Sequence, residues 1–217
     1  MFVLQIFYIW LKKETLMVEE LALTLQEKNF INDETAVFIF TVKKKITFVP
    51  GQYLIFKLDN GKEKKPRAYS ILSHENDGTL HFLIHLISNG FASDILRNLK
   101  QGDEITATGP LGHFNYADDE NEEAWFVGVG TGVAPLLSMI RGLFKQKTKK
   151  RIVLLFGAKT KNDLFFHQQL LEMEKEHANF TYYPSLTREE WSGRTGRVQH
   201  YLPEDIENKT FYICGMK

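Results

Sequence analysis

Cysteine is almost absent from this sequence, and its scarcity excludes several kinds of site. Cys214 is the single cysteine among 217 residues, so the chain forms no internal disulfide. It also builds no zinc or iron–sulfur centre from four cysteines of its own.

Net charge and a membrane-spanning segment are also lacking. Lys+Arg and Asp+Glu both total 27, which gives no general reason to expect a nucleic acid partner. The apolar stretch at residues 1–11, MFVLQIFYIWL, is too short to span a bilayer. It also lacks the basic region and cleavage site of a signal peptide. We expect residues 1–16 to be an extension outside the core of a cytoplasmic protein, with a membrane-surface anchor as the alternative.

The composition is that of an ordinary globular protein, and the first half of the chain reads as short strands. Hydrophobic residues make up 43% and charged residues 25% of the sequence. The expected strands are Thr35–Val42, Tyr53–Leu58, Ala68–Leu72, Leu80–Ile87 and Glu104–Thr108. Turn signals such as Pro50-Gly51 and Asn60-Gly61 separate them, and one helix is expected at Phe91–Leu99. This spacing predicts an antiparallel barrel or sandwich over residues 17–116.

After an acidic stretch at residues 117–123, which we interpret as a solvated linker, the pattern changes. Continuous apolar runs, typical of parallel strands buried on both faces, alternate with helical stretches. The expected strands are Trp125–Val129, Ile152–Phe156, Phe180–Pro184 and Phe211–Cys214. The expected helices are Pro135–Phe144, with proline at its first position, and Asp163–Glu176, capped by Asn162 or Asp163. Residues 124–217 are thus predicted to form an α/β domain.

Three glycines stand at the junction of the first of these strands and helices. Gly128, Gly130 and Gly132 lie in FVGVGTGVAP, the setting of a dinucleotide-binding turn. The usual GxGxxG spacing would need glycine where Val133 stands, and no acidic residue follows about twenty positions on. The residues alone leave two interpretations open, a tight strand-to-helix turn or a different nucleotide-binding loop.

Several short motifs occur in one order along the chain. RAYS at Arg67–Ser70 precedes NGFAS at Asn89–Ser93 and GPLGHF at Gly109–Phe114, and VGVGTGVAP and a final YICGMK follow. This ordered set resembles the ferredoxin–NADP reductase family of flavoproteins over about residues 18–217. The resemblance implies an antiparallel Greek-key β-barrel that binds FAD, followed by a parallel-sheet, Rossmann-like NAD(P) domain.

The resemblance implies a flavin site in the barrel. Arg67 would pair with the FAD diphosphate, Tyr69 would stack on the isoalloxazine ring beside Ala68, and Ser70 would act catalytically by a hydrogen bond near N5. Taken without the family, Arg67 is a surface charge and Tyr69 is ordinary core.

A second motif would hold the diphosphate at the start of the barrel's helix. The four residues concerned are Gly90, Phe91, Ala92 and Ser93. A plain turn with a cap from Asn89 or Ser93 is the alternative. The motif favours FAD over FMN. His85, on a strand directed toward this region, receives no role.

The resemblance also implies a nucleotide site in the second domain. Gly130, Thr131 and Gly132, followed by Pro135 at the helix start, would line the nucleotide diphosphate. Cys214, with Gly215 clearing space, would lie catalytically beside C4 of the nicotinamide.

The resemblance also implies that the loop after the third strand decides between NADP(H) and NAD(H). Thr187, Arg188 and Arg197, with Arg194 between them, favour a 2′-phosphate and hence NADP(H), with NAD(H) the alternative.

Family members continue beyond the CG element with a helix and a strand. We therefore expect this domain to lack its last helix and strand, leaving Phe211–Cys214 at an exposed edge. The predicted function is hydride transfer from NAD(P)H to FAD, and then electron transfer by a monomer to a separate acceptor such as ferredoxin or flavodoxin. A non-catalytic flavin- or nucleotide-binding subunit and a free-flavin reductase remain alternatives. Lysines at 43–45 and 62–65 would either steer an acidic partner or keep strand edges soluble.

Overall fold

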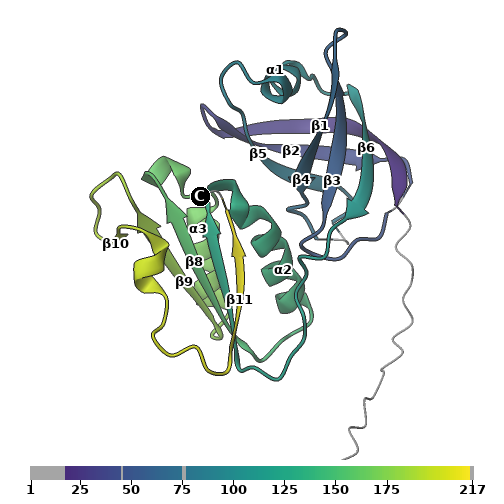
Figure 1. The fold of residues 1–217 in the computed structure, drawn as a ribbon. Helices are drawn as coiled ribbons and strands as arrows, with labels where there is room; N and C mark the ends of the chain where they lie inside the picture. Colours follow the sequence, from purple (N-terminus) through teal and green to yellow (C-terminus); the bar gives the residue numbers. More distant parts are fainter. Residues whose placement is uncertain (1–17, 45, 75–76, 216–217) are drawn as a thin grey trace, which may run out of the picture.

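The structure is a computed structural model that describes residues 18–44, 46–74 and 77–215. It holds two sheets, a curled antiparallel half-barrel and a parallel sheet flanked by helices (Figure 1). The expectations for residues 1–16, for Lys45 and for residues 216–217 lie outside the described residues. Within the described part, no helix has the length and apolar character needed to cross a membrane.

The half-barrel is a six-stranded sheet in the order β4-β3-β6-β1-β2-β5. Its strands are β1 (Glu19–Asn32), β2 (Thr35–Val42), β3 (Tyr53–Asp59), β4 (Lys64–Ser70), β5 (Leu80–His85) and β6 (Glu104–Leu111). Alternation places Leu54, Phe56 and Leu58 of β3 in the core while their neighbours face outward. Phe40 and Phe82 meet Phe56 in edge-to-face contacts that fill the centre. The helix α1 (Phe91–Asn98) closes the far end of the half-barrel.

Strands β1 and β4 differ most from the expectation, while β3, β5 and β6 differ from it only in where they end. Strand β1 was not predicted, although Leu21, Leu23 and Leu25 are buried at every second position. Its second half, Glu27–Asn32, is mostly polar and pairs only with β2. Strand β4 ends at Ser70 and does not include Ile71–Leu72, because Ile71 N donates to the Gln52 carbonyl and the chain turns toward the second sheet.

The second sheet is parallel, in the order β10-β9-β8-β7-β11. Its strands are β7 (Glu123–Val129), β8 (Arg151–Ala158), β9 (Phe180–Leu186), β10 (Arg194–Thr195) and β11 (Lys209–Cys214). Helices α2 (Val133–Lys145) and α3 (His167–Glu176) cover one face, and the short helix η3 (Val198–Tyr201) packs on the other. The predicted succession of a half-barrel and a parallel α/β sheet is confirmed.

Strand β11 lies at one edge of the described sheet, paired only with β7. Ile213 of this strand is 63% exposed. The expectation that Phe211–Cys214 borders an open edge therefore holds for the residues that the structure describes.

Both helix starts in this half were misplaced by the sequence pattern. Helix α2 begins at Val133, so that Pro135 is its third residue and not its first. Asp163 belongs to a separate short helix, η2 (Lys161–Asp163), where Thr160 and Asp163 form a reciprocal capping box. Helix α3 then begins at His167, after Phe166 turns the backbone in the left-handed region with φ 63°. Neither Asn162 nor Asp163 caps α3.

The acidic stretch at 117–123 is more than a solvated linker. Asp119 accepts a hydrogen bond from Lys150 Nζ at 2.6 Å and another from the Thr210 hydroxyl. Tyr212 OH contacts both backbone groups of Ala117. The final residue of the stretch, Glu123, already belongs to β7. These contacts fasten the connection to the start of the parallel sheet.

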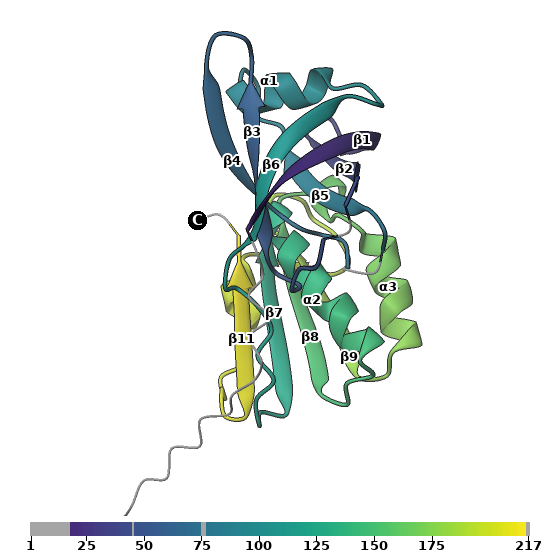
Figure 2. The same ribbon diagram turned by 90° about the vertical axis from the view of Figure 1, so that its right-hand side faces the viewer.

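The two sheets join through α2 and the loop that follows β4. The buried Ser138 hydroxyl donates to the Ser73 carbonyl at 2.8 Å, and Arg141 donates to the Leu72 carbonyl at 3.2 Å. Figure 2 shows the half-barrel stacked on the end of the α/β part at which β7, β8 and β11 finish. In open parallel sheets, ligands bind at this end, so the half-barrel lies over the expected binding edge.

Candidate nucleotide-binding site

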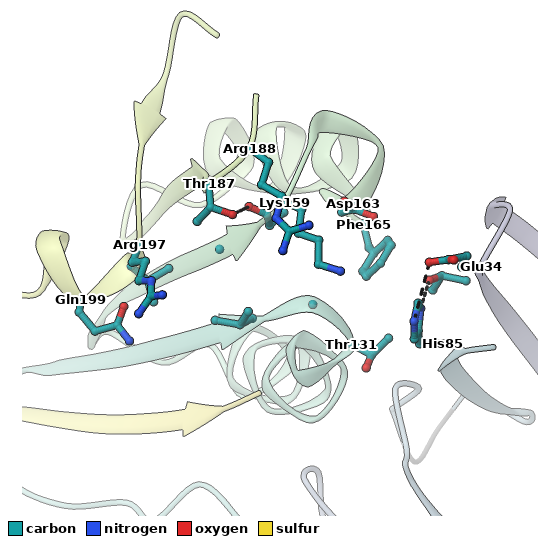
Figure 3. A pocket seen from close by; sticks show the side chains of 16 residues that line it. Glu34, His85, Thr131, Lys159, Asp163, Phe165, Thr187, Arg188, Arg197 and Gln199 are labelled. Atoms are coloured by element: carbon teal, nitrogen blue, oxygen red, sulfur yellow. Dashed lines mark hydrogen bonds and ion pairs between the residues drawn. The ribbon is translucent and has the colours of Figure 1, made fainter. Parts of the chain in front are cut away.

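A cavity of about 360 Å³ lies at the carboxyl ends of β7, β8 and β9 (Figure 3). Most of its lining follows these strands: Val129, Gly130, Thr131, Gly157, Ala158, Lys159, Asp163, Phe165, Thr187, Arg188, Arg197, Val198 and Gln199. Three further residues come from the half-barrel, namely Glu34, Thr35 and His85. Five predicted nucleotide-site residues therefore converge on one cavity: Gly130, Thr131, Thr187, Arg188 and Arg197.

Each glycine of the turn has a separate structural reason. A Cβ on Gly128 would lie 3.3 Å from Val133 Cα, so this glycine lets α2 approach β7 closely. Gly130 adopts φ 56°, and a Cβ built on it meets no atom within 4 Å, so it faces open space. A Cβ on Gly132 would lie 2.5 Å from the Cys214 carbonyl oxygen. Gly128 and Gly132 therefore allow close packing, as in a tight strand-to-helix turn, while Gly130 leaves open space, as a nucleotide-binding loop requires.

The Cys214-Gly215 pair lies directly against this turn. Cys214 is in register with Gly128 across β11 and β7, and Gly215, at φ 153°, would place a Cβ 3.0 Å from Val129. Burial raises the pKa of the Cys214 thiol, so the sulfur stays protonated at neutral pH. A protonated thiol is not a thiolate nucleophile.

The cavity lining also includes a group of cationic side chains. Arg188 and Arg197 line it with Thr187, whose hydroxyl donates to the Ala158 carbonyl at 3.3 Å. Lys159, at the end of β8, joins them, and the sequence pattern did not single it out. None of these three cations forms a salt bridge with a described carboxylate. Nearby Glu189 instead pairs with Lys161 at 3.4 Å.

Arg194 does not take part in this cationic group. Its guanidinium carbon lies 3.9 Å from the centre of the Tyr183 ring and 5.6 Å from that of Tyr201. Such stacking is a cation–π contact beside the edge strand β10. The expectation that Arg194 joins Arg188 and Arg197 is therefore wrong, because Arg194 does not line the cavity, whereas Lys159 does.

The predicted flavin residues follow one another along β4. Arg67 is exposed, and its only hydrogen bond within the described part of the chain runs from Nη1 to the neighbouring Pro66 carbonyl at 2.8 Å, which leaves most of its donors available. Ala68 is exposed beside it. Tyr69 packs on Phe56 with ring centres 4.9 Å apart, and burial raises its pKa to about 12. Ser70 pairs with Tyr53 at the end of the strand, next to the junction with α2.

The second predicted flavin element lies at the start of α1. Gly90 is the N-cap residue, and neither Asn89 nor Ser93 caps the helix with its side chain, so that expectation is wrong. Ser93 is instead buried, and its hydroxyl lies 3.1 Å from a Cβ built on Gly90. Phe91 and Ala92 are half-buried, and Lys65 Nζ of β4 lies 5.0 Å from the centre of the Phe91 ring. This contact brings the Arg67 strand beside the helix start.

The lysines proposed to steer a partner are mostly neutralised. Lys43 pairs with Glu104, Lys44 with Glu19, Lys64 with Asp59, and Lys65 with Glu63. Lys64 and Lys65 also lie at the end of β4 that faces α1, six and five residues before Ser70. At about 3.3 Å per strand residue, they are roughly 16–20 Å from the predicted ring site.

Comparisons with known proteins give two domain matches. Residues 22–116 match the model of the oxidoreductase FAD-binding domain, and residues 126–217 match that of the oxidoreductase NAD-binding domain. The anthranilate 1,2-dioxygenase electron transfer component of Acinetobacter baylyi is 30% identical over 179 residues, which is 79% of this chain and 51% of that protein. The chain thus spans about half the length of the curated relatives it matches.

Solved structures agree on the fold. A cytochrome P450 reductase of Amycolatopsis superposes with a TM-score of 0.84 at 25% identity, over 92% of this chain and 62% of that one. A ferredoxin NADP+ reductase of Neisseria gonorrhoeae, with bound FAD and NADP, gives a TM-score of 0.78 at 21% identity, over 91% and 85% of the two chains. At 21% identity, the similarity to the Neisseria gonorrhoeae structure shows the fold alone.

Proposed function

The chain belongs to the ferredoxin–NADP reductase type of flavoprotein, and from this we propose that it passes reducing equivalents from a nicotinamide dinucleotide through FAD to a separate acceptor. The observation that carries the proposal is the cavity at the carboxyl ends of the parallel strands. Its lining combines an open glycine turn, whose Gly132 packs against Cys214, with Lys159, Arg188 and Arg197. A reduced nicotinamide dinucleotide matches this lining, because it combines an uncharged dihydronicotinamide ring with anionic phosphate groups.

The residues present fit a nucleotide at this place. Gly130 leaves its Cβ position open at a positive φ, so a phosphate can approach bare backbone there. Thr131 and the start of α2 offer backbone N–H groups and the positive end of the helix dipole. Cys214 and Gly215, packed on Gly132, would bound the space for the nicotinamide. These residues bind and orient, so that reaction depends on holding two rings in contact.

The residues along β4 fit a flavin in the same way. Flavin, when bound, supplies the chemistry that accepts a hydride and releases electrons singly. Arg67 would hold the diphosphate with its free guanidinium donors, together with the helix start at Gly90–Ser93. Tyr69 would support the ring with the face that does not meet Phe56. Ser70 would donate a hydrogen bond at the reacting edge, beside the junction of the two sheets.

The acceptor is proposed to be a separate electron carrier, such as ferredoxin or flavodoxin. With one cysteine, the chain cannot itself hold a four-cysteine cluster. Its relatives include an electron transfer component of a dioxygenase and a component of the Na⁺-translocating NADH-quinone reductase of Neisseria meningitidis, both named for redox chemistry. Because most of the clustered lysines are paired, we expect recognition of the carrier to depend less on long-range steering than on contact near Ser70.

NADP(H) is proposed as the preferred nucleotide, because Thr187 and three cations without a described carboxylate partner line the cavity. The alternative is NADH, which appears in the name of the Na⁺-translocating NADH-quinone reductase subunit of Neisseria meningitidis, one of the relatives. The test is the KM of each nucleotide in ferricyanide reduction by the FAD-loaded protein. Replacing Arg188 and Arg197 with alanine should raise the KM for NADPH by about 100-fold, since each charge-assisted bond contributes about 1.5–3 kcal/mol, and should leave NADH nearly unchanged.

Arg194→Ala is the matched control, because Arg194 lies in the same loop but stacks on Tyr183 and Tyr201. Equal losses with both nucleotides in the double variant would mean that the arginines do not read the 2′-phosphate. A protein that takes up no FAD and oxidises neither nucleotide would instead refute the proposed reductase and favour a binding subunit. Rapid loss of flavin on dilution, with activity restored by free flavin, would indicate a free-flavin reductase.

A further inference from the structure

One wall of the nucleotide cavity comes from the half-barrel and not from the α/β part. Glu34 and Thr35 lie where the β1–β2 hairpin turns, and His85 ends β5 directly opposite Thr35 in the antiparallel register. Strand β5 contacts the glycine turn, and Figure 3 draws Thr131 close to His85. A ligand seated on the glycine turn therefore meets a second surface that the sequence motifs do not include.

The His85 imidazole is held by a hydrogen bond at Nδ1, whereas Nε2 faces a carboxylate beyond hydrogen-bond distance. Nδ1 lies 3.2 Å from the Thr35 hydroxyl, and Nε2 lies 3.9 Å from Glu34 Oε2. The two side chains of the ion pair are 35% and 66% exposed. A pair so exposed contributes little to folding stability, so its place in the cavity calls for another explanation.

The hairpin that carries Glu34 is itself fixed to the other side of the cavity. Asn32 Nδ2 donates to the Asn162 carbonyl and to Asp163 Oδ1, both at 3.2 Å. The Arg97 guanidinium donates to the carbonyls of Asp33 and Leu86, on either side of the Glu34–His85 pair. The wall is therefore set at a defined distance from the glycine turn before any ligand binds.

The charges that face His85 can be named for each surrounding element. Glu34 comes from the hairpin, Asp163 from η2, and Lys159 from the end of β8. The Asp163 carboxylate already accepts hydrogen bonds from Thr160 and Asn32. Lys159 lies on the α/β side of the cavity, so a protonated His85 is the cation that the half-barrel wall presents to the turn.

We propose that His85 binds the diphosphate of the dinucleotide as a cation, and that Glu34 is a positioning residue that orients the imidazole for this contact. The inference rests on the proposed function. Nucleotide affinity therefore depends in part on a contact that the half-barrel supplies.

The test is the Kd of NADP+ for the FAD-loaded protein, measured by calorimetry and given as the ratio of each variant's Kd to that of the wild type under the same conditions. His85→Gln should bind about tenfold more weakly, as expected for one lost charge-assisted bond. His85→Lys, which places a cation at this position, should bind about as tightly as the wild type.

Glu34→Gln should weaken binding several-fold in the wild-type background and have no effect in His85→Gln, since Glu34 acts through the imidazole. Glu120→Gln, an exposed carboxyl outside the cavity, is the control. Flavin absorbance and circular dichroism establish that each variant is folded. Tighter binding by Glu34→Gln would show that Glu34 only repels the phosphates, and would overturn the proposal, as would a Kd of His85→Gln equal to that of the wild type. A wild type that does not bind NADP+ would instead refute the proposed function.

Discussion

Replacing Gly132 with alanine should damage this protein more than replacing Gly130, although sequence rules suggest the reverse. Gly130 has φ 56°, which disfavours any other residue, whereas Gly132 has φ −61°, which alanine adopts freely. The structure reverses the order. An alanine Cβ at 132 would lie 2.5 Å from the Cys214 carbonyl oxygen and 2.6 Å from Gly215 Cα, whereas at 130 it would meet nothing within 4 Å.

The magnitudes follow from these contacts. At Gly130 the cost is that of one left-handed alanine, about 1–2 kcal/mol. At Gly132 the obstructing atoms are backbone, so β11 or the turn must move, and overpacking of this kind costs about 1–3 kcal/mol and occasionally more. For a chain of this size each kcal/mol lowers the unfolding midpoint by about 2–4 °C. The Gly132 variant should also bind nucleotide poorly, because the displaced segment carries Cys214.

The assay is thermal unfolding of both variants, with nucleotide affinity measured on the same preparations. The reasoning requires that Gly132→Ala lose at least as much stability as Gly130→Ala and far more nucleotide affinity. Equal affinities in the two variants, with Gly132→Ala as stable as the parent, would refute the close approach of the turn to Cys214–Gly215.

Three further predictions follow from other contacts. Arg67→Ala should release FAD on dilution at least tenfold more readily, since the guanidinium has no other described partner than the Pro66 carbonyl; unchanged retention by equilibrium dialysis would move the diphosphate elsewhere. Ser138→Ala should lower stability by about 1–3 kcal/mol, because the buried Ser73 carbonyl across the junction loses its donor, and a midpoint equal to the parent's would contradict this. Hydrogen bonds from Lys150, and then Thr210, hold the pKa of Asp119 below its ordinary 3.8. Its contribution to stability is therefore present above that value and lost as the pH falls through the lower folded pKa. Asp119→Asn should be less stable than the parent at neutral pH and should lose less on acidification, as pH-dependent unfolding midpoints would show.

The local residue pattern determined the elements with strong periodicity. Thr35–Val42 was located to the residue because all its side chains except that of Ala36 are β-branched or aromatic. The buried runs of β7 and β8 were recognised because parallel strands covered on both faces need apolar residues throughout. The motif order RAYS, NGFAS and VGVGTGVAP carried the family, and with it the two-domain fold.

Where the local signal was weak, boundaries were wrong for identifiable reasons. Strand β1 was not predicted because its second half, Glu27–Asn32, is mostly polar and pairs only with β2. The start of α2 was placed at Pro135 by a rule about first helical positions, while the short helix at Gly130–Gly132 had already begun the turn. Asp163 looked like a cap for α3 because the sequence does not show that Phe166 breaks the helix between them.

The composition of the cavity was decided by the tertiary structure. The family resemblance grouped Arg188, Arg194 and Arg197, but in the structure Arg194 of β10 stacks on Tyr183, and Lys159 from the end of β8 lines the cavity with the other two. Glu34 and His85 reach the cavity only because β2 pairs with β5 and the half-barrel docks over the carboxyl ends of the parallel strands. A sequence motif shows which residues lie at the end of one strand and can contact a ligand there. The order of the strands and the docking of the half-barrel decide which of these strand ends contact the same ligand. No local sequence pattern contains that information.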